Sequence, residues 1–164
     1  MKNLLLMRHA KSSWKDTSLL DHQRPLNKRG KRDAPRMGEH LREQGVLLDA
    51  ILCSTATRAR ETVAGLLDEY TFEEEVLYFD DLYQADPETI IALLKQLPDE
   101  VETAMVVAHN PGLDYFLETV CDENEHMPTA CVAYIQLPLE RWSDFHEATE
   151  GELLHLWKSR EIKL

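Results

Sequence analysis

The stretch LLLMRHAKSSW, residues 4–14, changes abruptly from apolar to charged. Its first residues are typical of a short buried strand, which covers residues 3–7 when Asn3 is included. Arg8 and His9 follow where this strand ends, a position that α/β proteins often use to bind ligands. Taken alone, the pair fits equally well a strand end that carries a surface arginine and an incidental histidine. The rest of the chain has to decide between these two interpretations.

The apolar pattern predicts that strands and helices alternate along the chain. Beyond residues 3–7, strands are expected at residues 48–53, 76–79, 103–109, 130–138 and 151–162. Helices are expected at residues 27–45, 54–70, 87–97 and 112–121. This alternation predicts a three-layer α/β/α sandwich with a mainly parallel central sheet, and with antiparallel pairing at one edge for the two final strands.

Two of the predicted helices carry signals at their ends. Asn27 is expected to cap the first helix and Gly45 to stop it, while Pro35 should make that helix irregular or delay its regular start. Ser54 or Thr55 is expected to cap the second helix.

Length and cysteine content indicate an ordinary globular protein. The 164 residues fit a single domain that spans residues 1–164. No apolar run is long enough for a secretory signal or a membrane span. Cys53, Cys121 and Cys131 are odd in number and lack C-x-x-C spacing, which argues against a disulfide framework. We therefore expect a cytoplasmic protein without membrane association.

The charge is strongly acidic and unevenly distributed. A net charge of -12 disfavours nucleic acid as a partner, because nucleic-acid binders present positive surfaces to phosphates. Residues 1–60 hold 13 of the 18 Lys and Arg and only 6 of the 30 Asp and Glu, which gives them a net charge of +7 against -19 for the remainder. This asymmetry indicates a cationic patch built mainly from the first third of the chain.

Basic side chains follow three of the predicted strands. Arg8 and His9 come after the first strand, Arg58 lies one turn into the helix after the second, and His109 follows the strand at residues 103–109. Because the carboxyl ends of parallel strands meet at one edge of a sheet, these side chains can converge in a single crevice. Arginine forks match phosphate oxygens, and a helix start adds backbone donors. The sequence therefore predicts a site for a phosphoryl group.

Three motifs carry a resemblance to a known family. The segments RHA (8–10), STATRARET (54–62) and VVAHNPG (106–112), in that order, are similar to the histidine phosphatase superfamily, also called phosphoglycerate mutase-like. Within it, LLLMRHAKSSWKD (4–16) followed by DHQRPLNKRG (21–30) resembles the short phosphohistidine phosphatases of the SixA type. The family fold is an α/β sandwich, in accord with the pattern of strands and helices.

The resemblance implies roles for four residues. His9 would be the nucleophile that attacks a phosphoryl group and carries it as a phosphohistidine intermediate. Arg8 and Arg58 would bind the equatorial oxygens, and His109 would complete the pocket and stabilise the transferring charge. No metal or other cofactor is then required, because the arginines supply alignment and charge compensation.

The sequence departs from the broader family at two points. The glycine that usually follows the R-H pair is Ala10, and no general acid stands out. The carboxylates on offer are Asp16, Asp21, Asp80, Asp81 and Asp86, none of which is favoured over the others. Since a protonated imidazole leaves more readily than an alkoxide, the missing acid favours phosphohistidine over phosphate esters as the substrate. In the loop after the first strand, Lys11 and Ser12 are candidates for substrate contact.

Two other hydrolase mechanisms fit poorly. A cysteine phosphatase with C-x5-R spacing would need an arginine at position 59, where the chain has Ala59, so Cys53 is better interpreted as a buried strand end. The seven histidines show no spacing typical of a metal site, such as H-x-H or H-E-x-x-H.

The favoured interpretation is a phosphatase that acts on phosphohistidine in a protein, such as a histidine-containing phosphotransfer protein, and that works as a monomer. One alternative is a phosphatase for small phosphate esters on the same fold. Another is a noncatalytic reader that binds a phosphorylated partner through the same arginines. His9 and His109 weigh against the reader, because binding alone needs no positioned nucleophile.

Overall fold

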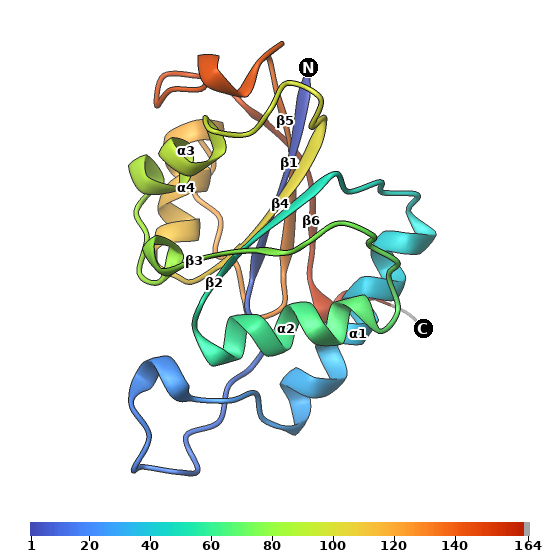
Figure 1. The fold of residues 1–164 in the computed structure, drawn as a ribbon, viewed down its shortest axis with the longest axis vertical. Helices are drawn as coiled ribbons and strands as arrows, with labels where there is room; N and C mark the ends of the chain where they lie inside the picture. Colours follow the sequence, from blue (N-terminus) through green and yellow to red (C-terminus); the bar gives the residue numbers. More distant parts are fainter. Residues whose placement is uncertain (163–164) are drawn as a thin grey trace.

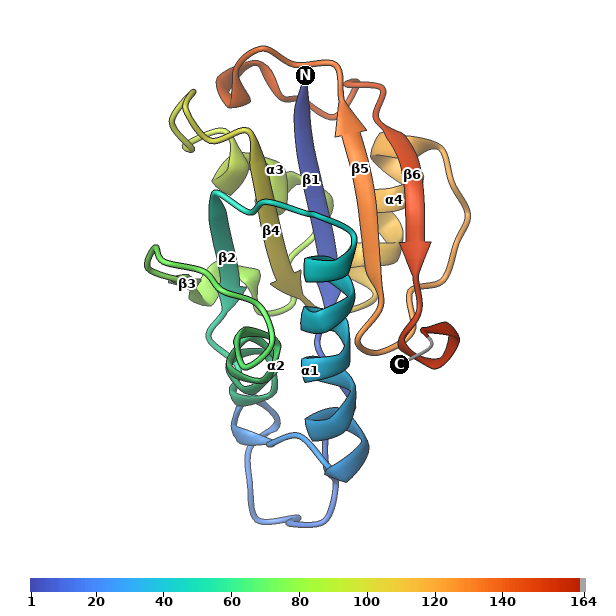
Figure 2. The ribbon, with the colours of Figure 1, turned by 90° about the vertical axis from the view of Figure 1, so that its right-hand side faces the viewer.

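The strand predicted at residues 3–7 is β1 (Lys2–Arg8), which lies inside a six-stranded sheet of order β3-β2-β4-β1-β5-β6. The structure is a computed structural model that describes residues 1–162. β2 (Ala50–Ser54), β3 (Leu77–Phe79) and β4 (Thr103–Ala108) run parallel to β1. β5 (Val132–Leu137) pairs antiparallel with β1, and β6 (Glu152–Trp157) pairs antiparallel with β5 (Figure 2). The predicted mainly parallel sheet with an antiparallel edge is confirmed.

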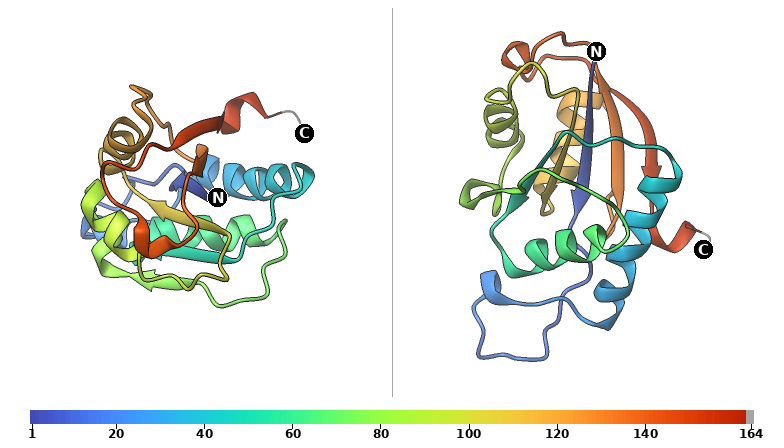
Figure 3. Two further views of the ribbon diagram at one scale, coloured as in Figure 1. Left: turned by 90° about the horizontal axis from the view of Figure 1, so that it is seen from above. Right: turned by 45° about the vertical axis from the view of Figure 1, so that its right-hand side comes forward.

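Helices cover both faces of this sheet. α1 (Lys28–Glu43) and α2 (Thr57–Leu67) lie on one face, and α3 (Pro87–Leu94) and α4 (Gly112–Cys121) lie on the other (Figures 1 and 3). Four short 3-10 turns complete the described chain: η1 (Asp21–Gln23), η2 (Asp80–Leu82), η3 (Trp142–Asp144) and η4 (Ser159–Glu161). The predicted three-layer α/β/α architecture is confirmed.

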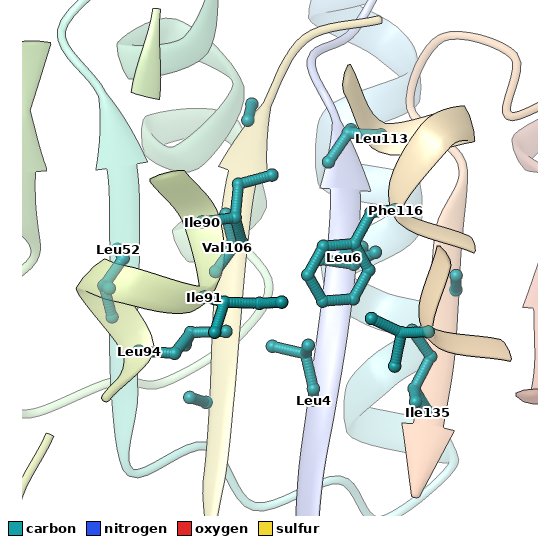
Figure 4. Packing of buried hydrophobic residues seen from close by; sticks show 14 of the residues in the cluster. Leu4, Leu6, Leu52, Ile90, Ile91, Leu94, Val106, Leu113, Phe116 and Ile135 are labelled. Atoms are coloured by element: carbon teal, nitrogen blue, oxygen red, sulfur yellow. The ribbon is translucent and has the colours of Figure 1, made fainter. Parts of the chain in front are cut away.

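The apolar run of β1 serves two hydrophobic cores. Leu4 and Leu6 pack with α3 and α4, where Phe116 lies against the sheet (Figure 4). Leu5 and Met7 point to the opposite face and pack with α1 and α2. Because side chains alternate along a strand and both faces are covered, the middle of a central strand, here residues 4–7, is apolar on both faces. The polar residues of β1, Lys2, Asn3 and Arg8, are therefore confined to its two ends.

The predicted start and stop signals of α1 are confirmed, but Pro35 and the end of the last strand differ from the prediction. The Asn27 side chain accepts a hydrogen bond from the Gly30 amide at 2.9 Å, and Gly45 follows the helix with a φ of 72°, so the predicted cap and stop are confirmed. Pro35 lies inside α1, which continues across it without a break. The final strand ends at Trp157 rather than at residue 162, because the chain turns into η4.

The predicted cap of α2 is wrong. Ser54 is the last residue of β2, and the N-cap position of α2 is Ala56, which provides no side-chain cap. The Ser54 hydroxyl accepts a hydrogen bond from the Ala56 amide at 3.2 Å and contacts His109. Ser54 therefore belongs to the edge of the sheet where the predicted site residues gather.

None of the helices within residues 1–162 combines the length and the apolar character needed to cross a bilayer.

Candidate active site

The carboxyl ends of three neighbouring parallel strands bring the four predicted site residues together. β2, β4 and β1 are adjacent in the sheet, and all three end at the lower edge in Figure 1. The ring centroids of His9 and His109 lie 5.0 Å apart, and Arg58 Nε lies 3.4 Å from His9 Nε2. Arg8 is close enough for its charge to act on His9 and Arg58. Side chains from three distant segments of the sequence thus share one site.

The surroundings of His9 favour a neutral ring whose basic nitrogen is Nε2, which accepts a long hydrogen bond of 3.4 Å from Arg58 Nε. The ring is 7% exposed, and its Nδ1 lies 2.8 Å from the Ala10 carbonyl oxygen, which can only accept a hydrogen bond. The proton therefore resides on Nδ1, and Nε2 is the basic atom. Burial, together with the charges of Arg58, Arg8 and Arg24, lowers the pKa of His9 to about 4. A neutral imidazole at ordinary pH is a competent nucleophile.

One ring nitrogen of His109 has no hydrogen-bond partner within residues 1–162. Its Nε2 lies 2.8 Å from the Ser54 hydroxyl, whose oxygen already accepts from the Ala56 amide. The Ser54 hydroxyl has a second lone pair and a proton, so it can either accept from or donate to His109 Nε2; when it donates, the imidazole proton is on Nδ1. His109 Nδ1 is buried and unpaired among the described residues. Burial and the neighbouring His9 and Arg58 lower the pKa of His109 to about 3, so the ring is neutral.

Arg8 presents a second unpaired nitrogen. Its Nη1 donates to the Met127 carbonyl at 3.1 Å, whereas its Nε is buried without a partner. Only one other buried side-chain nitrogen or oxygen within residues 1–162 is unpaired besides Arg8 Nε and His109 Nδ1. A buried polar atom without a partner costs about 1–3 kcal/mol, so two of them in residues that neighbour His9 indicate a place for a ligand, and the charges of Arg8 and Arg58 favour an anion.

Asp21 holds Arg58 in place. Arg58 Nη1 donates to the Asp21 backbone carbonyl at 2.8 Å, and Nη2 donates to Asp21 Oδ2 at 3.0 Å. Tyr83 also donates to Oδ2 at 2.5 Å, and Arg24 donates to Oδ1 at 2.8 Å. With both terminal nitrogens of Arg58 anchored, its Nε faces His9 Nε2. Asp21 is a positioning residue that directs Arg58 toward the nucleophile.

Asp21 is unsuited to act as a general acid. The hydrogen bond from Tyr83 contributes most to a pKa of Asp21 that is well below the ordinary range, and Arg24 and Arg58 lower that pKa further. The carboxylate therefore remains ionised and has no proton to give. Of the other carboxylates weighed from the sequence, Asp80 accepts from Thr55 Oγ1 at 2.6 Å, and Asp86 caps α3 through the Thr89 amide at 2.9 Å.

Replacing Asp21 by asparagine should lower kcat about 10- to 100-fold with a smaller change in KM, because small misplacements of a catalytic group carry penalties of this size. The amide side chain keeps the shape of the carboxylate but cannot accept hydrogen bonds at both of its terminal atoms from Arg58, Arg24 and Tyr83. Steady-state kinetics on Asp21→Asn and on Asp16→Asn, which replaces an exposed carboxylate in the same loop, would separate this effect from loss of surface charge. A kcat unchanged by Asp21→Asn would contradict the positioning role.

Arg24 joins the two arms of the loop of residues 11–27 to each other. Its Nη2 donates to Ser12 Oγ at 2.5 Å, its Nε donates to the Ser13 carbonyl at 3.1 Å, and its guanidinium lies 3.2 Å from the ring centre of Trp14. Ser12 is therefore buried against Arg24, whereas Lys11 is exposed. Substrate contact by Lys11 or Ser12 stays a prediction.

Sequence reasoning missed two parts of the site and misassigned two others. Tyr83 and Arg24 were not identified, although Arg24 lies in the motif DHQRP. Asp21 was considered only as an acid, and Ser54 only as a helix cap. The side chain of Tyr83 contacts both Asp21 and the His109 ring, whose centroid lies 5.4 Å from its own. No local pattern marks Tyr83, because its partners come from distant segments.

The structure also bears on the two mechanisms that the sequence disfavours. Cys53 is buried at the end of β2, and burial raises the pKa of its thiol to about 12, so it is no thiolate nucleophile. Within residues 1–162, no group of three or more His, Cys, Asp or Glu side chains is arranged to hold a metal ion.

Comparison with known proteins finds a family model that covers the motifs of Arg8, His9 and Arg58. Residues 4–86 match the model of the histidine phosphatase superfamily (branch 1). An uncharacterized protein of Mycobacterium leprae is 44% identical over 110 residues, which cover 65% of this chain and 66% of that protein. This match therefore spans slightly less than two thirds of the mycobacterial relative. An uncharacterized chloroplastic protein of Arabidopsis thaliana is 32% identical over 152 residues, covering 87% of this chain and 70% of that protein.

Solved structures share the fold over nearly the whole chain. The protein histidine phosphatase SixA complexed with tungstate superimposes with a TM-score of 0.84 at 22% identity, covering 98% of this chain and 99% of that one. A Nakamurella protein assigned as phosphohistidine phosphatase SixA gives 0.83 at 29% identity, with 96% and 95% covered. An Escherichia coli protein assigned as an alpha-ribazole-5'-P phosphatase gives 0.74 at 18% identity, with both chains fully covered.

Proposed function

Because the chain belongs to the histidine phosphatase superfamily, we propose that it is a phosphatase that removes the phosphoryl group from phosphohistidine in a protein through a covalent intermediate on His9. One observation carries the proposal: a buried neutral imidazole whose basic Nε2 lies 3.4 Å from Arg58 Nε, next to Arg8 and His109, each of which has one buried side-chain nitrogen without a partner in the described part of the chain. This arrangement suits a phosphoryl group in contact with a nucleophile.

The reaction proceeds in two displacements at phosphorus. His9 Nε2 attacks the phosphoryl group, a new P–N bond forms, and the P–N bond to the substrate imidazole breaks while that imidazole takes up a proton from solvent. Water then attacks the phosphorus on His9, the P–N bond breaks, and inorganic phosphate leaves. Arg8, Arg58 and His109 bind the equatorial oxygens throughout and compensate their charge.

The substrate assignment follows from the groups that face the nucleophile. Asp21, the carboxylate bound to Arg58, is held ionised and cannot protonate an alkoxide leaving group. An imidazole needs no dedicated acid, because its ring nitrogen is basic enough to be protonated by water. SixA proteins among the structural relatives also support a phosphorylated protein as the substrate.

The experiment that tests the proposal compares substrates. The purified protein is assayed, with a chelator present, on a phosphohistidine-bearing protein and on a panel of small phosphate esters. We expect kcat/KM to be highest for phosphohistidine. Preference for an ester would instead favour the small-molecule alternative, which the shared fold of the Escherichia coli relative makes the next candidate. Binding of phosphoproteins without turnover would identify a noncatalytic reader.

The ionisation of His9 gives a pH prediction. With a pKa of about 4 in the folded protein, the His9 ring should stay neutral down to roughly pH 5, and activity that depends on it should be lost only as the pH falls through about 4. The folded state binds fewer protons here than the unfolded chain, whose histidines titrate near 6.5, so stability should fall as the pH decreases from about 6.5 toward 4. Nitrogen NMR of the ring measures this directly. Titration of His9 between pH 6 and 7 would contradict the assignment.

A further inference from the structure

A hollow beside His109 is larger than a phosphoryl group requires. Its volume is about 370 Å³, and its walls come from the turn before α3 and the start of α4. Both His109 and Tyr115 line it, and Tyr115 is 55% exposed. Pockets of 300–1,000 Å³ are typical of sites that enclose an organic group. The hollow can therefore receive the part of the substrate that carries the phosphoryl group.

This hollow continues into a second one that is acidic. Asp86 and Tyr115 line both, so the two form one track from His109 along α3 and α4, which lie side by side in Figure 1. The second hollow has a volume of about 440 Å³. Its other acidic residues are Glu88, Glu118 and Glu147, all exposed, and with Asp86 they form what we call the acidic rim.

The negative charge of the acidic rim is not neutralised by the protein. No ion pair joins any of its four carboxylates to a cation within residues 1–162. A hydrogen bond with the Glu147 side chain, followed by the charges of Glu147 and Asp86, raises the pKa of Glu88, so these carboxylates lie close together. The rim would repel a small metabolite that carries a second anionic group and would attract a cation.

We propose that this track binds the polypeptide on one side of the substrate phosphohistidine, and that it selects a segment with lysine or arginine at the acidic rim. The inference rests on the proposed function and specifies its substrate. The phosphoryl group lies against His9 and His109, the adjoining peptide lies in the hollow beside Tyr115, and a basic side chain reaches Glu88, Glu118 and Glu147.

The test uses three phosphohistidine peptides that differ only in whether lysine, serine or glutamate flanks the phosphohistidine. Wild-type protein should favour the lysine peptide over the glutamate peptide about tenfold in kcat/KM, the scale of a few screened charge pairs. Each rate is expressed relative to the same variant's rate on phosphoramidate, which has no peptide portion. Salt at about 1 M, where the Debye length is near 3 Å, should remove most of the preference.

A matched pair of variants tests whether the acidic rim causes the preference for the lysine peptide. The triple variant Glu88→Gln, Glu118→Gln, Glu147→Gln should lose most of this preference. The control Glu73→Gln, Glu74→Gln, Glu75→Gln removes the same charge from an exposed segment outside both hollows and should retain it. Equal rates on the three peptides, or a rim variant that keeps the wild-type preference, would overturn the inference and leave the phosphatase activity standing. No turnover of any peptide or of phosphoramidate would overturn the proposed function, and the inference with it.

Discussion

Replacing His9 by alanine should abolish turnover of phosphohistidine substrates, lowering kcat/KM by at least about 10⁴-fold, the scale seen when a covalent nucleophile is removed. The variant loses the only atom that we place in bonding contact with phosphorus. The oxygen-binding donors of Arg8, Arg58 and His109 remain, so His9→Ala should still bind phosphate or a similar oxyanion. Loss of turnover with retained binding would separate the nucleophile from the binding residues.

Two controls test whether His9→Ala loses activity because the nucleophile is missing and not because the fold is damaged. Free imidazole added to the variant can occupy the space left by the ring and accept the phosphoryl group, so partial recovery of activity is expected. His155→Ala removes an exposed histidine from β6, at the far edge of the sheet, and should leave activity unchanged. Wild-type turnover by His9→Ala would refute a phosphohistidine mechanism.

Replacing Arg58 by alanine should lower kcat/KM about 10³-fold, comparable with the loss of an arginine that stabilises phosphoryl transfer. Arg58 has two functions in the structure. Its charge lies beside the phosphoryl site, and its Nε, 3.4 Å from His9 Nε2, fixes the direction of the nucleophile. Arg58→Lys should recover only part of the activity. A lysine ammonium group cannot bind the backbone carbonyl and Oδ2 of Asp21 and also face His9.

Arg60 provides the matched control for Arg58. It lies on the same helix two residues later, but it is exposed, donates to the Thr55 carbonyl at 2.9 Å and lies over the ring of Tyr78. Arg60→Ala removes the same charge and should change kcat/KM by less than about threefold, as expected for an exposed residue that makes no contact with the site. If Arg58→Ala and Arg60→Ala were equally active, Arg58 would have no special role in phosphoryl transfer.

The strands and the convergence of the basic residues could be predicted because they follow from local pattern and simple topology. β1, β2 and β4 are buried on both faces, so each reads as a short apolar run, and the carboxyl ends of parallel strands share an edge. Arg8, His9, Arg58 and His109 then meet without any knowledge of loop conformation. Their catalytic roles remain the proposal that the experiments above address.

The contacts that hold Arg58 in place could not be predicted, because they depend on how loops pack against each other. Asp21 and Tyr83 are 62 residues apart and meet only after the loop of residues 11–27 packs against the turn that follows β3. Periodicity carries no information on such contacts. Ser54 shows a related difficulty: the same residue type suits a helix cap and a strand end, and here its hydroxyl contacts His109 rather than capping α2.

The most direct test of the proposed mechanism is to trap the enzyme during turnover. A phosphohistidine substrate is mixed with the protein, the reaction is stopped in base, which preserves P–N bonds, and the protein is analysed by mass spectrometry and phosphorus NMR. We expect one phosphoryl group per active site, attached to Nε2 of His9. Phosphate on another residue, or turnover at full rate with no phosphorylated protein at any time, would contradict a phosphoryl transfer through His9.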